Sequence, residues 1–348
     1  MIQFNHFKRL FFYISIIILI FFTVFISSGQ TVHAMKVAHY SYDKIYKALP
    51  AKYQKEEFIY TYNGIPFISF ATYNGSSDYK TSLKKSSNTN NFLYCVDFSK
   101  HMVFDKNFSE KNKLFNNELR ARIGIALHLG TTKWGKKADA SFTNGNAMLD
   151  YYMTQLVIHS LIYKYGGEKS NYGIQFSLLE FKSGTDSLYK KCKKLYEHCC
   201  NAKITLKNGN FQTAEFSFNK PVSNQLYLDG DYLTSPMITC QTNKNNASVQ
   251  EYKRTVTLNG NNSVPCRIEQ SSDSYDSQFQ IKLPLDSIED LSPGEHRINI
   301  NEYAIFKKEI AGFWNCSDKE LTNTNQEIGG LIYINDEALD NCGFEFLI

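Results

Sequence analysis

The sequence lacks a strong excess of charge of either sign, and proline is scarce. The 348 residues carry a formal net charge of +4 and include 7 prolines. No basic stripe accompanies this small charge, so a nucleic-acid-binding protein is not indicated. Neither a repeat of convincing length nor a low-complexity tract occurs. The chain has 43% apolar residues and many aromatic ones, which allows two or three modest domains with cores of their own.

A regular cysteine framework is also missing. The eight cysteines are irregularly spaced, and a chain of this length does not depend on disulfides for its stability. Cys240 with Cys266, and Cys316 with Cys342, are plausible local pairs. The sequence leaves the disulfide connectivity open.

Three of the cysteines stand in one helical segment. Cys192 and Cys199 lie at helical spacing with Leu188, which predicts buried thiols on an apolar helix face. The alternative is a zinc site that adds His198 and Cys200 to these thiols. It lacks a second ligand pair, so neither a metal nor another cofactor is predicted.

The N-terminus has the pattern of a secretory signal peptide. Lys8 and Arg9 precede an uncharged run over residues 10–26, and Ala34 ends a stretch of the kind that a signal peptidase cleaves. We therefore predict a signal peptide over residues 1–34, with an uncleaved membrane anchor as the alternative. Residues 344–348 hold no Leu-Pro-x-Thr-Gly sorting signal, so the mode of anchoring is left open.

The first part of the remaining chain begins with strand patterns. Asn63-Gly64 and Asn74-Gly75 stand between aromatic and β-branched runs, which is typical of β-hairpins. Residues 76–91 are rich in Ser, Lys and Asn and are expected to form a loop. A further strand is predicted over residues 91–98.

Helical periodicity follows these strands. It predicts one helix that ends at Gly130, a second over residues 147–165 and a third over residues 185–199. Strands and helices together indicate a mixed β-sheet and helical-bundle domain over residues 35–200. The predicted fold class is therefore α+β.

The helical pattern stops at Cys200. Over residues 201–300, short β-branched and aromatic runs alternate with Asn-Gly and Asp-Gly turns, which is typical of an all-β, Ig-like sandwich. The segment 301–348 contains a short apolar run and has no clear assignment. It is treated as a C-terminal segment of uncertain structure.

Two short motifs in the first domain carry the candidate chemistry. Tyr94-Cys95 lies on a predicted strand, and Thr154-Gln155 lies on the predicted helix 147–165, followed by apolar residues. Alone, such a cysteine is most often a small buried apolar residue. In this order and context, the two motifs resemble those of the thioester domains of Gram-positive surface adhesins. The resemblance covers roughly residues 55–200.

The resemblance implies an internal thioester between Cys95 and Gln155. It further implies a secreted adhesin at the cell surface of a Gram-positive bacterium, which binds a host protein covalently and is not a turnover enzyme. The implied partner is an extracellular protein such as fibrinogen, with a Lys as the nucleophile. No nucleic acid, and no membrane beyond the signal or anchor, is expected as a partner.

The residue types suit this chemistry. A thiolate attacks an unactivated amide only when rigid elements hold the two groups close together. Gln is needed because ammonia can leave its amide, whereas a buried Glu carboxylate would repel the thiolate of Cys95. A tetrahedral oxyanion needs donors, and backbone N–H groups or the hydroxyl of Tyr94 or Tyr152 are candidates.

His159 follows Gln155 by one helical turn, so the two side chains share a face. Thioester domains often have Trp at this place. His159 could act as a base for the incoming amine. A packed or hydrogen-bonded histidine is the alternative.

Two other functions are compatible with the same residues. A cysteine hydrolase or transglutaminase-like enzyme would pair Cys95 with His128 or His159 and use Asp97 or Asp150 as the acidic partner, but the usual cysteine-protease contexts are absent. A non-covalent, β-rich adhesion module would leave Cys95 and its partner merely buried.

Overall fold

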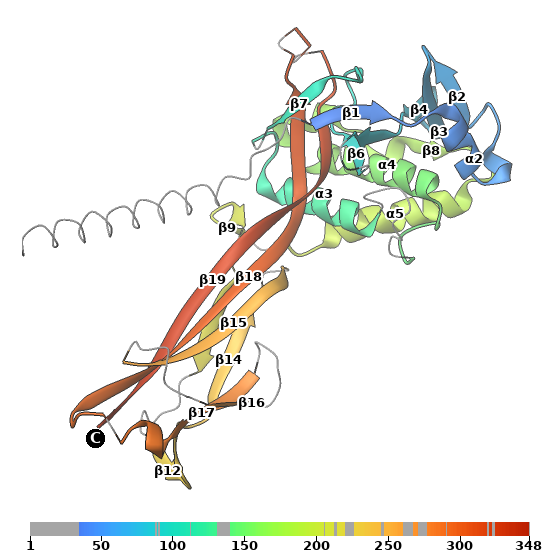
Figure 1. The fold of residues 1–348 in the computed structure, drawn as a ribbon. Coiled ribbons are helices and arrows are strands. Elements are labelled where there is room, and N and C mark those ends of the chain that lie inside the picture. Colours follow the sequence, from blue (N-terminus) through green and yellow to red (C-terminus); the bar gives the residue numbers. More distant parts are fainter. Residues whose placement is uncertain are drawn as a thin grey trace, which may run out of the picture.

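The computed structural model describes residues 35–87, 89, 91–111, 113–130, 140–204, 206–211, 214–219, 226–244, 247–259, 267–270, 277–289, 291–318, 320–321 and 324–347. The predicted signal peptide, and Cys266 with its predicted pairing, lie outside these residues. A helix-containing lobe and an all-β lobe are connected by a long β-hairpin (Figure 1). In the described part, no helix is long and apolar enough to cross a membrane.

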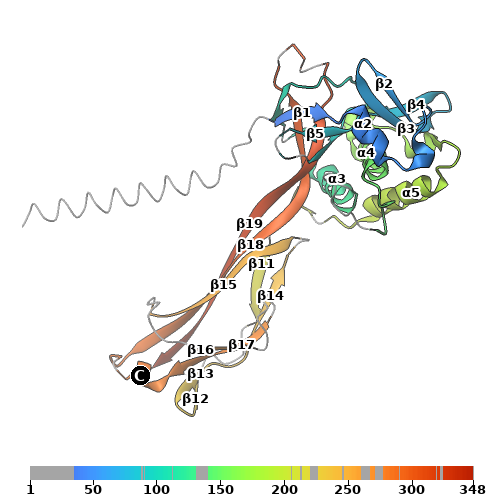
Figure 2. The ribbon, with the colours of Figure 1, turned by 45° about the vertical axis from the view of Figure 1, so that its right-hand side comes forward.

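The helices of the first lobe gather on one side of it (Figure 2). Asn146 caps the central helix, because its side chain accepts hydrogen bonds from the next backbone N–H groups. Nearly every side chain of this helix is buried, and it packs against its two long neighbours. All three predicted helices are confirmed. The helices are α2 (Tyr42–Ala48), α3 (Asn117–Leu129), α4 (Ala147–Tyr165) and α5 (Asp186–Asn201), with 3-10 turns η1 (Ala51–Tyr53), η2 (Gly167–Tyr172), η3 (Phe176–Leu178) and η4 (Leu285–Ser287).

The apolar face of α5 confirms the prediction for its cysteines. Cys192 and Cys199 are both 0% exposed, as is Leu195 between them. Neither thiol forms a disulfide.

A small antiparallel sheet confirms the predicted hairpins. Asn63, Gly64, Asn74 and Gly75 all have positive φ, as tight hairpin turns require. The expected loop over residues 76–91 is wrong, because it contains two short strands in which polar residues such as Lys84 and Ser86 take buried positions, so the usual strand pattern is hidden. The strands are β2 (Ile59–Tyr62), β3 (Ile65–Tyr73), β4 (Ser77–Thr81) and β8 (Leu179–Phe181), with β5 (Lys84–Ser86) in the next sheet.

A larger sheet connects the two lobes. Its order is β15-β18-β19-β6-β5-β1-β7, and β7 also pairs with β18, so the part in the first lobe closes on itself. The strands are β1 (Met35–His39), β6 (Phe92–Cys95), β7 (Asn107–Glu110), β15 (Ser248–Leu258), β18 (Glu295–Cys316) and β19 (Ile328–Leu347).

The C-terminal segment, which had no assignment from the sequence, forms most of the long hairpin. β18 runs through residue 300 without a break and pairs with β19 from Glu295 to Trp314. Cys316 and Cys342, named as a plausible local pair, form no disulfide with each other. Ile300 faces Cys342, whereas Cys316 pairs with Phe108 at the other end of β18, roughly 50 Å away at the usual rise per residue.

The second lobe has two β layers. One layer consists of β15 and of the parts of β18 and β19 that lie beside it, and the other layer is a six-stranded sheet. Apolar side chains of both layers, among them Phe279, Ile281, Ile300 and Phe306, form one core. The remaining strands are β9 (Leu206–Lys207), β10 (Asn210–Phe211), β11 (Glu215–Asn219), β12 (Tyr227–Asp229), β13 (Tyr232–Thr234), β14 (Ile238–Asn243), β16 (Arg267–Gln270) and β17 (Ser277–Pro284).

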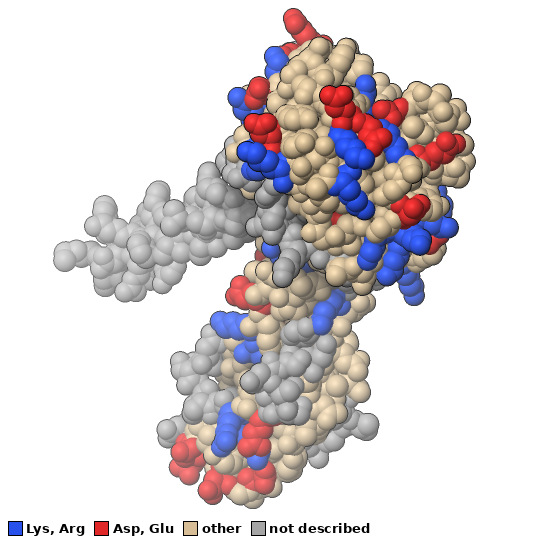
Figure 3. All heavy atoms as spheres, turned by 90° about the vertical axis from the view of Figure 1, so that its right-hand side faces the viewer, with Lys and Arg blue, Asp and Glu red and all other residues tan. Residues whose placement is uncertain are grey.

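Charged side chains of both signs occupy the face of the helical lobe in Figure 3. Lys and Arg are interspersed there with Asp and Glu. This face therefore carries no large field of one sign.

Candidate functional site

Cys95 is the last residue of β6, and Gln155 lies in the middle of α4. In the register, Cys95 faces Ile328 of β19. Cys95 is 2% exposed and Gln155 is 0% exposed. The structure thus brings together, in the interior, two predicted site residues that are 60 positions apart in the chain.

The side-chain amide of Gln155 is bonded to the backbone of Cys95 on both sides. The Cys95 N–H donates to Gln155 Oε1 at 2.7 Å, and Gln155 Nε2 donates to the Cys95 carbonyl oxygen at 2.8 Å. The Cys95 thiol donates to the carbonyl oxygen of Asp97 at 3.1 Å. The amide carbon is therefore held next to the residue that carries the sulfur, in one fixed orientation.

Two tyrosines of α4 fix the helix against the strands around this pair. The hydroxyl of Tyr151 donates to the carbonyl oxygen of Leu93 at 2.7 Å. The hydroxyl of Tyr152 donates to the carbonyl oxygen of Tyr79 at 2.9 Å. Both tyrosines are fully buried, so α4 cannot shift along the sheet without breaking these bonds.

The same contacts choose among the predicted oxyanion donors. Gln155 Oε1 accepts from the backbone N–H of Cys95, which is the kind of donor that stabilises a developing oxyanion. The Tyr152 hydroxyl is occupied by the β4 backbone instead. Of the predicted candidates, the backbone N–H of Cys95 is the one that contacts Gln155 Oε1, and its role as an oxyanion donor stays a prediction.

His159 contacts the other side of the amide. Its Nε2 lies 3.1 Å from Gln155 Nε2, and its Nδ1 lies 2.7 Å from the Tyr79 hydroxyl. Because the amide nitrogen is a donor, Nε2 is the acceptor, and Nδ1 carries the proton and donates to Tyr79. Burial, and then the charge of Lys84, lower the pKa of His159 to about 3. The imidazole is therefore neutral, with its lone pair directed at the amide nitrogen.

The thiol of Cys95 is protonated at neutral pH. Burial raises its pKa to about 12, while the ammonium group of Lys84 acts in the opposite direction. A resting thiolate is thus not available, and any attack by sulfur requires that its proton moves to another group.

A cleft of about 510 Å³ reaches Cys95 and His159. Its lining joins exposed aromatic side chains to the buried interior, and it includes Tyr62, Lys84, Cys95, Phe98 and His159. The Phe98 ring packs edge-on against His159, with centroids 5.6 Å apart. A small group entering from solvent therefore reaches Cys95 past an aromatic wall.

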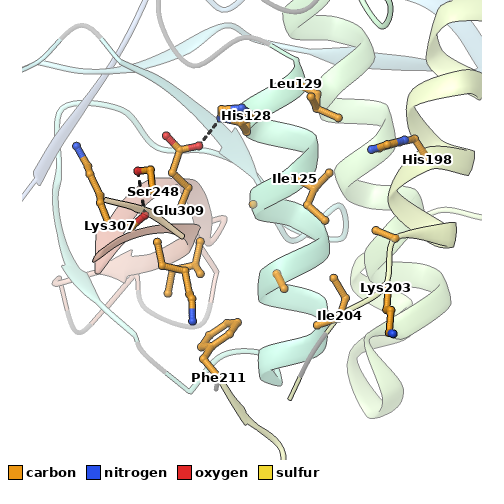
Figure 4. A pocket seen from close by; sticks show the side chains of 15 residues that line it. Ile125, His128, Leu129, His198, Lys203, Ile204, Phe211, Ser248, Lys307 and Glu309 are labelled. Atoms are coloured by element: carbon orange, nitrogen blue, oxygen red, sulfur yellow. Dashed lines mark hydrogen bonds and ion pairs between the residues drawn. The ribbon is translucent and has the colours of Figure 1, made fainter. Parts of the chain in front are cut away.

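The other histidine considered for a hydrolase lies elsewhere. His128, at the end of α3, contacts the carboxylate of Glu309 of β18 in a separate pocket (Figure 4). Asp150 accepts from the Asn144 N–H at 2.7 Å, and burial raises its pKa to about 6. Asp97 pairs with Lys100, 3.0 Å apart. Only His159 among the predicted bases contacts the Cys95–Gln155 pair.

Two residues of the site were not predicted from the sequence. Tyr79 orients His159, and Lys84 is a buried amine in the cleft. Both lie in the segment that was expected to be a loop. The one available signal was the alternation of polar and apolar residues around Tyr79, which is typical of a half-buried strand.

No protein-family model and no curated protein sequence matches this chain. Among solved structures, the chain is similar to the Bacillus anthracis TIE protein, with a TM-score of 0.54 and 17% identity over 83% of this chain and 48% of that one. It therefore spans about half the length of that structure.

Two shorter solved structures are also similar. One is the thioester domain of the Enterococcus faecium TIE86 protein, with a TM-score of 0.45 and 15% identity over 90% of this chain and 96% of that one. The other is the thioester domain of the Staphylococcus aureus TIE protein, with a TM-score of 0.32 and 10% identity over 78% and 91%. The Bacillus anthracis similarity shows a common fold alone. At that level, the resemblance inferred from the sequence is confirmed.

Proposed function

We propose that Cys95 and Gln155 form an internal thioester that captures a primary amine. The observation that supports this most is the pair of hydrogen bonds by which the backbone of Cys95 brackets the Gln155 amide. An ordinary buried glutamine needs partners, but it does not need both groups of the same cysteine. The exclusion of water around the pair would protect a thioester from hydrolysis.

The bond-forming step releases ammonia. The sulfur of Cys95 attacks the side-chain carbonyl carbon of Gln155, and the oxyanion is held by the Cys95 N–H. The C–N bond then breaks, and the thiol proton leaves with the nitrogen as ammonia. His159 Nε2, which contacts that nitrogen, can relay this proton.

In the capture step, an amine is the attacking group and the Cys95 sulfur is the leaving group. An incoming amine attacks the same carbon, the C–S bond breaks with its electron pair going to sulfur, and an amide bond remains. One amine proton ends on the Cys95 sulfur, so atoms and charge balance. Since each molecule reacts once, the protein is not a turnover enzyme in this proposal.

The test is the intact mass of the purified protein. We expect a mass one ammonia below that of the sequence, and a gain of one methylamine after incubation with it. Cys95→Ala and Gln155→Ala should show the full sequence mass and no gain. A wild-type protein with full mass and no methylamine would support the non-covalent adhesion module instead.

The wider role that we propose is that of a secreted adhesin at the surface of a Gram-positive bacterium. The signal-peptide pattern and the resemblance of the two motifs support it. The partner would be a host extracellular protein such as fibrinogen, which offers a Lys amine. The interspersed charges in Figure 3 suit a protein partner better than nucleic acid. Recovery of a Gln155–Lys cross-linked peptide after incubation with fibrinogen would test the partner.

We further propose that the second lobe is an Ig-like sandwich that presents the first lobe. Its two β layers around one core support this. The predicted domain boundaries, at residue 200 between the first domain and the sandwich and at residue 300 between the sandwich and the C-terminal segment, stay predictions. Limited proteolysis that cuts first near residue 202 would support the earlier boundary.

A further inference from the structure

Lys84 is a buried amine in the wall of the cleft. Burial lowers its pKa, and the neighbouring Cys95 acts in the opposite direction, so a negative sulfur favours the ammonium form of Lys84. Lys84 lies on β5 and is 2% exposed. Its ammonium group donates to the carbonyl oxygen of Ser82 at 3.3 Å. Among the described residues, no carboxylate lies within ion-pair distance of it. A buried ammonium without a carboxylate is costly for stability, so its presence calls for a reason other than packing.

The register of the sheet puts Lys84 beside Cys95. Lys84 faces Leu93 on β6, and Cys95 follows Leu93 by two positions, so both side chains lie on the same face. Such diagonal neighbours are within reach of a long side chain. The bond to Ser82 turns the ammonium towards the Cys95 end of β6, and both residues line the same cleft.

The positive charge of Lys84 affects the pKa of Cys95 and of His159. Burial raises the pKa of the Cys95 thiol, and Lys84 opposes this rise; burial lowers the pKa of His159, and Lys84 lowers it further. The other charges that face Cys95 are Asp97 and Glu327, which favour the protonated thiol. Each of them is paired with a lysine at 3.0 Å, so the Lys84 ammonium is the uncompensated charge there.

We propose that Lys84 is a positioning residue that holds a positive charge against the Cys95 sulfur, where it stabilises the thiolate that attacks Gln155 and the thiolate that leaves on amine capture. This inference rests on the proposed thioester. As the C–S bond breaks, its electron pair moves to sulfur next to the ammonium group. The amine proton passes to neutral His159 and then to the sulfur. Lys84 itself forms and breaks no bond.

The first experiment does not need the thioester. In a Gln155→Ala background, no acyl group is available, and the alkylation of Cys95 by iodoacetamide is followed against pH by peptide mass mapping. We expect Lys84→Met to shift this profile upwards by about one pH unit or more. Lys85→Met, the neighbouring lysine on the opposite face of β5, should leave it unchanged. An identical profile in Lys84→Met and the parent would overturn the proposal even if the thioester exists.

The second experiment follows the reaction itself. Lys84→Met should slow methylamine capture at least about tenfold at pH 7, which corresponds to one pKa unit on the thiol. Lys84→Arg, which keeps the charge, should recover part of the rate, and Lys85→Met should react as wild type does. Equal capture rates in Lys84→Met and wild type would overturn the proposal.

Two checks exclude other roles of Lys84. A structural role predicts a lower melting temperature for Lys84→Met, whereas our proposal predicts an equal or higher one, because the variant buries no charge. A direct nucleophile would give a Lys84–Gln155 cross-linked peptide with Cys95 open to alkylation. Either a marked loss of stability or that cross-link would overturn the electrostatic role.

Discussion

The two lobes bury charge in different ways. In the second lobe, Arg254 of β15 faces Glu302 of β18, forms an ion pair with it and stacks on Phe279 at 3.6 Å. In the first lobe, Lys84 is buried as well but has a backbone carbonyl in place of a described carboxylate. A matched pair stabilises the packing of two strands, whereas an unmatched charge next to a thiol is available to act on it. Arg254 thus illustrates a buried cation that stabilises the fold, and Lys84 a buried cation that acts on a neighbouring reactive group.

The lobes also differ in self-sufficiency. β6, which carries Cys95, has β19 as a neighbour, and β7 pairs with β18, so the C-terminal hairpin completes the first lobe. A fragment of residues 35–201 should therefore not fold. A chain that joins residues 35–203 through a short Gly/Ser linker to residues 307–335 should fold and capture methylamine. Circular dichroism measures whether each of the two chains folds, and intact mass measures capture. If the fragment 35–201 folds, the C-terminal hairpin is not needed to complete the first lobe.

Disruption of the ion pair between Arg254 and Glu302 should have the next largest effect, a loss of stability. Glu302→Gln leaves Arg254 buried with a neutral partner and should lower the free energy of unfolding by about 3–5 kcal/mol. Glu309→Gln, on the same strand but in the half-exposed pair with His128, should cost less than about 1 kcal/mol. Urea titration measures both. Methylamine capture at 20 °C should be unchanged in each, and a slower capture in Glu302→Gln would show that the lobes are coupled.

The fold was predictable where the signal is local. The Asn-Gly turns and the apolar periodicity of α4 depend on neighbouring residues alone, and both were found. β18 was missed although its side chains alternate between buried and more exposed along most of its length, because polar residues such as Glu302 and Lys308 take buried positions and Ile305 takes a more exposed one. The wrong pairing of Cys316 with Cys342 has the same origin, since proximity in sequence says nothing about strand register.

Of the proposed site, the sequence predicted Cys95, Gln155 and His159. Cys95 and Gln155 were found because two short motifs resemble those of thioester domains. The places of Tyr79 and Lys84 depend on how β4 and β5 pair with their neighbours. The alternation around Tyr79 could have indicated β4 as a strand, but strand pairing depends on residues distant in the sequence. His159 was predicted as a base or as a packed residue, and its bonds on both ring nitrogens are compatible with either role.

The third and smaller effect is the loss of stability that His159 causes as the pH falls. Its pKa falls from 6.5 in the unfolded chain to about 3 in the folded one. Its contribution to stability is thus complete above pH 6.5 and is lost as the pH falls towards 3, at about 1.4 kcal/mol per pH unit. Between pH 7 and pH 5, wild type should lose roughly 2 kcal/mol more than His159→Phe. Asp150, whose pKa is raised, has the opposite sign but is common to both proteins.

The smallest expected effect separates the two roles of His159. Tyr79 accepts the Nδ1 proton and so keeps the Nε2 lone pair directed at the amide nitrogen. Tyr79→Phe removes one hydrogen bond worth about 1 kcal/mol and should slow methylamine capture roughly fivefold, while the protein still forms the thioester. Tyr53→Phe, which removes a bond to the Gly184 carbonyl oxygen outside the cleft, should lose similar stability without a change in rate. If both variants capture methylamine at the wild-type rate, His159 is a packing residue and not the base.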